Sequence, residues 1–286
     1  MSVTVRVPAK VNVQLAVGAA RRDGFHDLAN VFLAVGLYDE VTVAPADALR
    51  ITCEGPGSDQ VPLDASNLAA RAAIALAERH GIEPRVHIHI AKDIPVAGGM
   101  AGGSADGAGA LLACDRLWSL GTSQEDLLAL CADLGSDVPF SLLGGAALGT
   151  GRGEQLTPLT VGGAFHWVFA VADGGLSTPA VYGEFDRLNE GVRVPEPKAS
   201  PALLAAVSSM SVDSPVRPAP EALVARCTRP PVLRVPDLTA PVVARAALPV
   251  RRSASDIHMY PVFLVGATTA SRACAAAGRN HHRNVR

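Results

Sequence analysis

The feature that most constrains this fold is a glycine-rich loop that lies between a strand pattern and a helix pattern. Its sequence is Gly98-Gly99-Met100-Ala101-Gly102-Gly103-Ser104. Four glycines let the backbone approach a bulky anion, and the helix that follows points unpaired N–H groups and its positive dipole end toward that anion. We therefore expect a phosphate-binding loop, and the alternative is a flexible or tightly packed turn. Neither a Walker A motif nor Gly-x-Gly-x-x-Gly is present, so neither a P-loop ATPase nor a dinucleotide-binding fold is supported.

The patterns around the loop predict a mixed α+β architecture. Apolar alternation and Ala/Leu-rich periodicity interleave without the regular βαβ repeat of a doubly wound sheet. Asp64 or Ser66 is expected to cap one helix, and Ser123 with Asp126 resembles a capping box. A second glycine-rich run precedes the last predicted strand. The expected strands are 3–7 and 11–17 (two strands or one bent strand), 40–44, 85–90 and 165–171, the helices are 64–78, about 105–118 and 123–134, and the second glycine-rich run is 144–153.

The chain changes composition near residue 191. Residues 1–191 carry 12 Lys and Arg against 22 Asp and Glu, whereas residues 192–286 carry 13 against 5. The net charges of −10 and +8 nearly cancel in the whole chain. Of the 27 glycines, 25 lie before residue 192, while 12 of the 21 prolines lie after it. A length of 286 residues allows one large domain or two smaller ones, and this break suggests that the two parts differ in kind.

Cysteine and histidine usage argues against a disulfide framework or a zinc site. The five cysteines are odd in number and contain no Cys-x-x-Cys pair, which fits a reducing cytoplasm. His87 and His89 are interpreted as solvated strand residues, because no acidic or Cys partner has suitable ligand spacing. We expect no signal segment, and no window reaches the roughly 18 apolar residues needed to span a bilayer.

Two charged residues are candidates for catalysis. Asp137 follows a predicted helix end at Gly135 and could accept a proton from a hydroxyl group, although an aspartate in a turn more often bonds its own backbone. Lys10 follows a proline within an otherwise apolar strand. Such a lysine is usually a solvated edge residue, yet beside a phosphate loop it would stabilise developing negative charge.

Four segments, in order, carry a family resemblance. They are Pro8-Ala9-Lys10-Val11-Asn12, Arg22-Asp23-Gly24-Phe25-His26-Asp27-Leu28, the loop from Pro95 to Ala105, and Leu134-Gly135-Ser136-Asp137-Val138-Pro139-Phe140. They closely resemble the 4-diphosphocytidyl-2-C-methyl-D-erythritol kinases, an isoprenoid-pathway family of the GHMP kinase superfamily. The loop alone indicates the superfamily, and the Asp-Gly-Phe-His segment points to this member. The resemblance extends from residue 2 to about residue 206.

The resemblance implies an ATP-dependent phosphotransferase that acts on the 2-hydroxyl of 4-diphosphocytidyl-2-C-methyl-D-erythritol. Asp137 would take the proton of that hydroxyl, Lys10 would lie beside the oxygen and the transferring phosphoryl group, and Asn12 would orient the hydroxyl. Ser104 is the candidate ligand for Mg²⁺. The residues expected to wrap the ATP phosphates are Pro95, Val96, Ala97, Gly98, Gly99, Met100, Ala101, Gly102, Gly103, Ser104 and Ala105.

The same resemblance assigns the cytosine end of the substrate. His26 would contact the pairing edge of the base, Phe25 would provide a stacking face, and Tyr182 would be a second aromatic with Thr178 nearby. The family more often has Tyr at the position of Phe25. Stacking should survive this change, but any bond from the missing hydroxyl is lost, at a cost of about 1 kcal/mol.

The implied fold is a two-domain GHMP-kinase-type α+β fold whose N-terminal domain is like domain 2 of ribosomal protein S5. We expect the N-terminal ATP-binding domain at 1–160, the start of the C-terminal domain at 161–206, and an atypical, poorly ordered tail at 207–286. The family's late Gly-Ser-Gly-Pro-Thr-like loop has no counterpart in that tail. The second domain is therefore expected to be incomplete or non-native, and a frameshifted gene is one hypothesis for its origin.

This break bears on function and partners. Without the second wall of the active site, we expect weak or absent kinase activity and a tendency to aggregate. The alternatives are another GHMP small-molecule kinase, such as homoserine or mevalonate kinase, or a nucleotide-binding protein without catalysis. The Phe25-His26 pair argues against the first. The basic tail lacks interleaved aromatics and a recognisable motif, so we expect no nucleic-acid partner. We also expect no membrane partner, and a monomer or homodimer.

Overall fold

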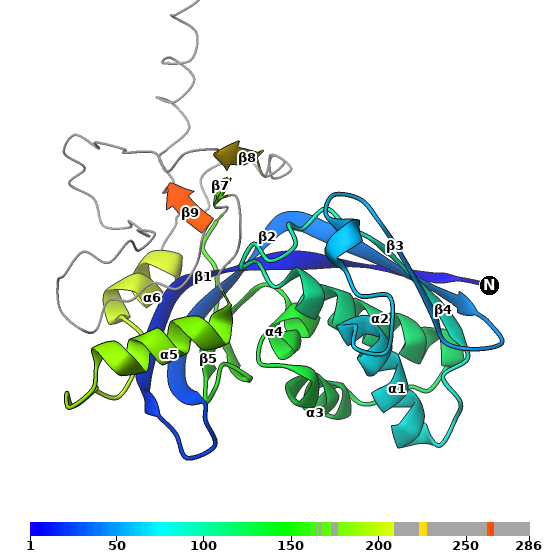
Figure 1. Cartoon of the computed structure of the whole chain (residues 1–286), viewed down its shortest axis with the longest axis horizontal. Coiled ribbons are helices and arrows are strands. Elements are labelled where there is room, and N and C mark those ends of the chain that lie inside the picture. The colour runs from blue at the N-terminus through cyan, green and yellow to red at the C-terminus, as the bar shows by residue number, and fades with distance from the viewer. Residues whose placement is uncertain (164, 166, 173–176, 209–222, 228–261, 266–286) are drawn as a thin grey trace, which may run out of the picture.

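The computed structural model describes residues 1–163, 165, 167–172, 177–208, 223–227 and 262–265. Two very long strands, β1 (Val3–Ala20) and β2 (His26–Pro45), run antiparallel along most of the molecule (Figure 1). The turn Arg21–Gly24 joins them, and Gly24 adopts a left-handed φ of 82° there. This hairpin connects the two ends of the molecule.

The second edge of β2 is shared by two further pairs of strands. Near its end, β2 pairs with β4 (Val86–Ala91), which pairs in parallel with β3 (Arg50–Glu54). Near its start, β2 pairs with β5 (Ala146–Thr150), which forms a hairpin with β6 (Gln155–Pro158). The result is a six-stranded mixed sheet in which β1 lies at an edge.

Four helices cover one face of this sheet: α1 (Leu68–His80), α2 (Gly102–Trp118), α3 (Gln124–Leu134) and α4 (Val138–Leu143) (Figure 1). Helix α2 lies closest to β1 and β2. A Cβ added to Gly109 would lie 2.9 Å from Val7 and 2.8 Å from Val41, so only glycine allows this close approach. A short 3-10 helix, η1 (Ser58–Gln60), precedes α1.

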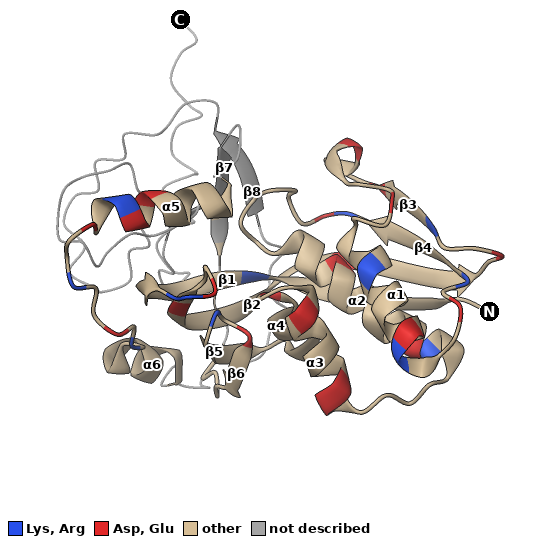
Figure 2. Ribbon diagram, turned by 60° about the horizontal axis from the view of Figure 1, so that its bottom comes forward, with Lys and Arg blue, Asp and Glu red and all other residues tan. Residues whose placement is uncertain are grey.

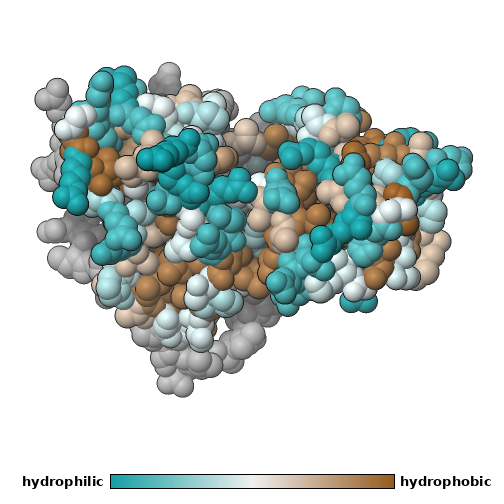
Figure 3. All heavy atoms as spheres, turned by 90° about the horizontal axis from the view of Figure 1, so that it is seen from below, coloured by the Kyte–Doolittle hydropathy of each residue, from teal (hydrophilic) through white to brown (hydrophobic). Residues whose placement is uncertain are grey.

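The core is aliphatic rather than aromatic, in keeping with an aromatic content of 4%. Val86, Ile88 and Ile90 of β4 are fully buried, while His87 and His89 alternate with them toward solvent, as predicted. Both histidines bond Thr52. Figure 2 shows acidic residues on α3. Figure 3 shows that on the face seen from below hydrophobic residues are interspersed with hydrophilic ones.

Three further described elements lie toward the other end of the β1–β2 hairpin. They are β7 (Val168–Ala172), α5 (Thr178–Leu188) and α6 (Pro201–Ser208). Gln14 of β1 bonds the main chain of Lys198 at 2.9 Å and Ser200 at 2.8 Å, which ties the segment before α6 to the long hairpin. Val181 and Tyr182 of α5 pack against a small cluster on β1 and β2.

Several predicted boundaries need correction. The sequence before Lys10 and after it forms one strand, β1, with register irregularities between Pro8 and Ala9 and between Asn12 and Gln14. Helix α1 is capped by Asn67, which accepts from Ala69 N at 2.8 Å. Asp64 instead bonds Ser66, so its turn precedes the helix. The 144–153 run contains strand β5, and the strand predicted at 165–171 is β7.

The Ser123 cap is confirmed, since its hydroxyl accepts from Asp126 N at 3.1 Å. Of the tail predicted at 207–286, most lies outside the described residues. Its described parts include β8 (Leu223–Cys227) and β9 (Val262–Val265), which pair with β7 in a three-stranded sheet. Among the described residues, no helix is long and apolar enough to cross a membrane.

Candidate active site

A cleft of about 880 Å³ is lined by residues of the β1–β2 hairpin, the glycine loop, the helical layer and α5. It joins three predicted groups of residues that are far apart in the sequence: the glycine loop, Asp137, and the aromatic residues around His26. Its walls are formed by Leu15, Gly24, Phe25, His26, Leu28, Asn30, residues 60–62, 66–68, 95–104, Lys92, Asp106, Ser136, Asp137, Arg152, residues 178–179, 181–183 and Asp186.

The glycine loop packs against strand β1 on one side and lines the cleft on the other. Met100 is only 1% exposed, and its carbonyl accepts from Lys10 N at 3.1 Å, which docks the loop on the edge of β1. Ala97 and Ala101 both adopt left-handed φ angles, 57° and 58°, although neither is glycine. Such backbone conformations are uncommon outside glycine and cluster at functional sites.

Helix α2 begins at Gly102, within the stretch predicted as loop, so the residues from Gly102 to Ala105 are helical. Its N-cap, Ala101, has no capping side chain, whereas α1 and α3 are capped by Asn67 and Ser123. The first N–H groups of α2 are therefore available to an anion in the cleft. Ala105 is an exception within the predicted loop, because it is fully buried in the helical core and does not line the cleft.

Lys10 and Asp137 form an ion pair beside the loop. Lys10 Nζ lies 3.1 Å from Asp137 Oδ2 and donates to Asn12 Oδ1 at 2.5 Å. Its side chain is 1% exposed, so the solvated-edge interpretation of Lys10 is wrong: the ammonium is held beneath the cleft by partners on two elements. Phe32 adds a cation–π contact at 5.4 Å.

Asp137 is the N-terminal neighbour of α4 but does not cap it with its side chain. The alternative interpretation, an aspartate that serves its own turn, is therefore wrong. The carboxylate is about one-third exposed and lines the cleft, while Lys10 and Asn12 lie behind it. This arrangement places a carboxylate oxygen at the surface of the cleft, with a buried cation immediately behind it.

The other end of the cleft is built from side chains of the β1–β2 hairpin and α5. The rings of His26 and Tyr182 stack with centroids 4.7 Å apart and an interplanar angle of 19°. Phe25 is 45% exposed, and Arg152 covers one of its faces at 5.1 Å. Thr178, the first residue of α5, also lines the cleft. The structure thus brings all four predicted base-end residues to one region.

Comparisons with known proteins agree with this geometry. The GHMP kinases N terminal domain model matches residues 67–145. The 4-diphosphocytidyl-2-C-methyl-D-erythritol kinase of Streptomyces avermitilis is 81% identical over 208 residues, covering 73% of this chain and 70% of that protein. Its counterpart from Streptomyces coelicolor is 76% identical over 209 residues, with the same coverage. The chain belongs to the 4-diphosphocytidyl-2-C-methyl-D-erythritol kinase family.

Solved structures extend this assignment to the fold. A crystal structure of 4-(cytidine 5'-diphospho)-2C-methyl-D-erythritol kinase matches with a TM-score of 0.57 at 33% identity, over 71% of this chain and 70% of that one. A homoserine kinase from Cytophaga hutchinsonii matches with a TM-score of 0.50 at 21% identity, over 64% and 59% of the two chains, and shares the fold. The predicted α+β fold of the GHMP kinase type is confirmed.

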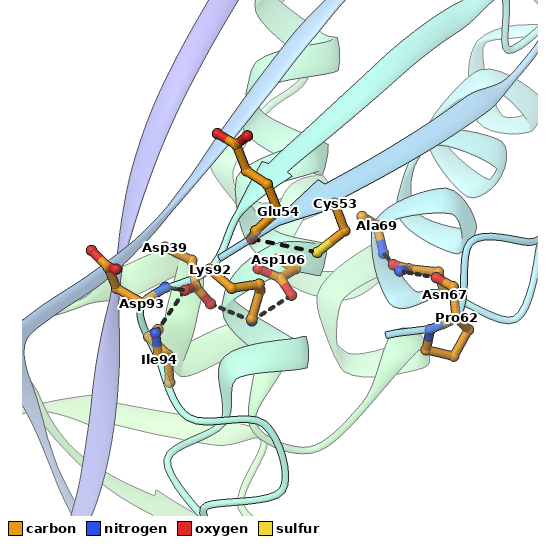
Figure 4. A network of polar contacts seen from close by, with 10 residues as sticks. All are labelled: Asp39, Cys53, Glu54, Pro62, Asn67, Ala69, Lys92, Asp93, Ile94 and Asp106. Atoms are coloured by element: carbon orange, nitrogen blue, oxygen red, sulfur yellow. Dashed lines mark hydrogen bonds and ion pairs between the residues drawn. The ribbon is translucent and has the colours of Figure 1, made fainter. Parts of the chain in front are cut away.

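In this member of the 4-diphosphocytidyl-2-C-methyl-D-erythritol kinase family, a buried polar network lies beneath the glycine loop (Figure 4). Lys92 Nζ bonds Asp39 and, at 2.8 Å, Asp106 of α2. Asp39 also accepts from the main-chain N–H groups of Asp93 and Ile94, at 2.8 and 2.9 Å. The network fixes the chain that leads from β4 into the loop.

The charges in this network perturb one another. Burial raises the pKa of Asp106 to about 7, although the Lys92 ammonium acts in the opposite direction. Burial lowers the pKa of Lys92, but Asp106 and Asp39 outweigh burial, and the net pKa lies above its ordinary value. Within the described part of the chain, Asp106 Oδ1 is buried without a hydrogen-bond partner.

Sequence reasoning missed Lys92, Asp106, Arg152 and Asp186, all of which line the cleft. The only local signal was that Lys92 and Asp106 flank the glycine loop. Ser104 lies in the first turn of α2 and, among the described residues, its hydroxyl makes no hydrogen bond, so it is available to a ligand. The described residues contain no group of three or more His, Cys, Asp or Glu suited to a metal ion.

Proposed function

We propose that this chain catalyses the ATP-dependent phosphorylation of the 2-hydroxyl of 4-diphosphocytidyl-2-C-methyl-D-erythritol, in the methylerythritol phosphate route to isoprenoid (terpenoid) precursors. The observation that carries the proposal is a single cleft lined by the glycine loop, Asp137 and the aromatic group around His26. The names of the relatives at 81% and 76% identity support the same reaction.

Phosphoryl transfer depends on positioning and charge neutralisation more than on covalent help. In the proposed reaction, N–H groups at the start of α2 hold the ATP phosphates. Asp137 accepts the proton of the substrate hydroxyl, which Asn12 helps to orient. Lys10 stabilises negative charge on the attacking oxygen and the transferring group, because its ammonium lies 3.1 Å behind the carboxylate.

Magnesium is the expected companion of ATP. Mg²⁺ in kinases is usually held by one or two protein oxygens together with substrate phosphates, so the small donor set here fits that ion. The Ser104 hydroxyl would hold it from the first turn of α2. When bound, the ion would neutralise charge on the phosphates.

At the base end, His26 contacts the pairing edge of cytosine, and Thr178 lies nearby. Arg152 already covers one face of Phe25, so the base stacks on the other face. Tyr182 supports the His26 ring by stacking on it and provides the second aromatic surface.

The test is product formation by the full chain with ATP, Mg²⁺ and the cytidyl substrate, followed by ³¹P NMR. A new phosphomonoester on the 2-hydroxyl is expected, whereas transfer to homoserine or mevalonate would identify a different GHMP kinase. A second candidate is a nucleotide-binding protein without catalysis, favoured by the absence of the late Gly-Ser-Gly-Pro-Thr-like loop from the sequence. ATP binding without any transfer would support that candidate.

The proposed setting is the cytoplasm, with small-molecule substrates and a monomeric or homodimeric chain. Among the described cysteines, Cys53, Cys114 and Cys131 are free thiols, in keeping with a reducing compartment. Burial raises the pKa of Cys114 and Cys131 to about 12, so both are inert core residues.

A further inference from the structure

We propose that Asp186 is a positioning residue that selects one tautomer of His26 and thereby makes the cleft prefer cytosine over uracil. This inference rests on the proposed function, because it deepens the role of His26 at the base end. Asp186 lies on α5, and its carboxylate Oδ1 is 2.8 Å from His26 Nε2.

The His26 ring has little freedom to move. Its side chain is 4% exposed, Tyr182 stacks on one face, and Phe185 contacts it edge-on with centroids 5.8 Å apart. Tyr182, Phe185 and Asp186 all come from α5, so one helix fixes the plane of the ring and the partner of one nitrogen. A ring held in this way presents its second nitrogen in a defined direction.

The partner of Nε2 decides the chemistry of Nδ1. An ionised carboxylate can only accept hydrogen bonds, so the proton of a neutral His26 must lie on Nε2. The Nδ1 atom is then an acceptor. In the described part of the chain Nδ1 has no hydrogen-bond partner, and the residue lines the cleft, so a ligand donor can satisfy it.

Cytosine and uracil differ at this kind of contact. Cytosine carries an exocyclic amino group, which donates, where uracil carries a carbonyl oxygen, which only accepts. A fixed acceptor in His26 pairs with the amino group and leaves the uracil oxygen facing another lone pair. Sites built around a buried polar group reject analogues that cannot satisfy it. Asp186 therefore acts on base selection without touching the base.

The first test needs no substitution. In ¹⁵N-histidine-labelled full-length protein at pH 8, the ¹⁵N chemical shifts of His26 report which ring nitrogen carries the proton. We expect a protonated Nε2 and an unprotonated Nδ1. A proton on Nδ1, alone or together with one on Nε2, would overturn the proposal directly.

The second test compares CDP and UDP binding by calorimetry in three variants. Asp186→Asn keeps an acceptor oxygen at the same place and should preserve the wild-type preference for CDP within about threefold. Asp186→Lys offers only donors to Nε2, so the proton should move to Nδ1 and the preference should fall by at least about tenfold. Glu184→Lys is the matched control, since Glu184 lies on α5 and pairs with Arg187.

The outcomes separate this inference from the proposed function. Equal binding of CDP and UDP by a wild-type protein with protonated Nε2 would overturn the inference alone. An unchanged preference in a folded Asp186→Lys variant would do the same. Binding of neither nucleotide by the wild type would overturn base recognition as a whole, while the phosphoryl-transfer assay judges the kinase reaction independently.

Discussion

The two ends of the cleft present different kinds of groups to a ligand, mainly main-chain groups at one end and side chains at the other. The end proposed to bind phosphate, called here the phosphate end, offers main-chain groups of the glycine loop next to the Lys10–Asp137 pair, with Met100 and Asp106 almost fully buried beneath it. The base end consists of side chains from two distant segments, and its members Phe25 and Asp186 are nearly half exposed. A binding surface made of main-chain groups is altered only when the residues that hold the backbone in place are changed. A binding surface made of side chains can be altered by substituting one contact residue at a time.

This difference predicts how substitutions should divide. Changes at or beneath the phosphate end should alter the catalytic rate or the stability of the fold. Changes at the base end should alter the affinity and choice of substrate while sparing the rate. Four experiments test that division.

The largest effect is expected for Asp137→Asn, which removes the proton acceptor next to Lys10. We expect kcat to fall by about 10³-fold relative to the unmodified chain, with ATP binding and CDP binding retained. The assay is single-turnover phosphate transfer together with equilibrium nucleotide binding. Asp133→Asn on the exposed face of α3 is the control. Retained activity in the Asp137 variant would contradict its assigned role.

The second effect concerns the packing of α2 against strands β1 and β2. Gly109→Ala should lower the free energy of unfolding by about 2–3 kcal/mol, because its Cβ would lie within 3 Å of Val7 and Val41. Gly103→Ala on the same helix should be neutral or slightly stabilising, since its nearest neighbour would be Leu68 at 3.8 Å. Denaturant unfolding of both variants measures the difference. Equal free energies of unfolding for the two variants would show that the hairpin can accommodate a methyl group at position 109 without loss of stability.

A third effect depends on pH. Asp106 has a pKa of about 7 in the folded protein, above its ordinary value of 3.8, so the folded state binds more protons between these values. Stability contributed by this group is present at low pH and is lost as pH rises through 7. Asp106→Asn should remove this loss, so its stability relative to wild type should rise steadily as pH is raised from 4.5 to 8.

Denaturant unfolding at several pH values measures this trend, and the exposed Asp93→Asn supplies a matched neutralisation. A constant difference between Asp106→Asn and wild type across the range would mean that Asp106 is ionised throughout. The network of Lys92, Asp39 and Asp106 would then hold two carboxylates around one ammonium and carry a net negative charge.

The smallest effect is expected at the base end. Phe25→Tyr restores the hydroxyl found more often in the family and should lower KM for the cytidyl substrate by up to about fivefold, the equivalent of about 1 kcal/mol. The value of kcat should stay the same. Steady-state kinetics with saturating ATP measures kcat and KM separately. A parallel change in kcat would contradict the expectation that changes at the base end spare the catalytic rate.

The phosphate end could be predicted from the sequence because its information is local. The loop, the helix behind it, Lys10 and Asp137 are each carried by a short motif. Lys10 still proved buried rather than solvated, since its environment depends on Asp137 and on the docking of Met100. Local patterns therefore identified these residues but not their burial.

The residues that hold the two ends of the cleft in place could not be predicted, because each contacts a residue far away in the sequence. Asp186 meets His26 across 160 positions, and Lys92 meets Asp39 across 53. Neither contact follows from periodicity, capping or turn chemistry. The start of α1 was misplaced for a local reason, since Asp64 and Asn67 are both good caps and only the loop geometry decides between them.

The register shifts in β1 determine where the β1–β2 hairpin can tolerate an inserted or deleted residue. Side chains alternate between the faces of a strand, so a slip of one residue reverses all of them. The shifts after Pro8 and after Asn12 isolate the short stretch that carries Lys10 from the rest of β1. A residue gained or lost in the outer parts of the strand can be absorbed at these irregularities. A single deletion between them would turn the ammonium of Lys10 away from Asp137.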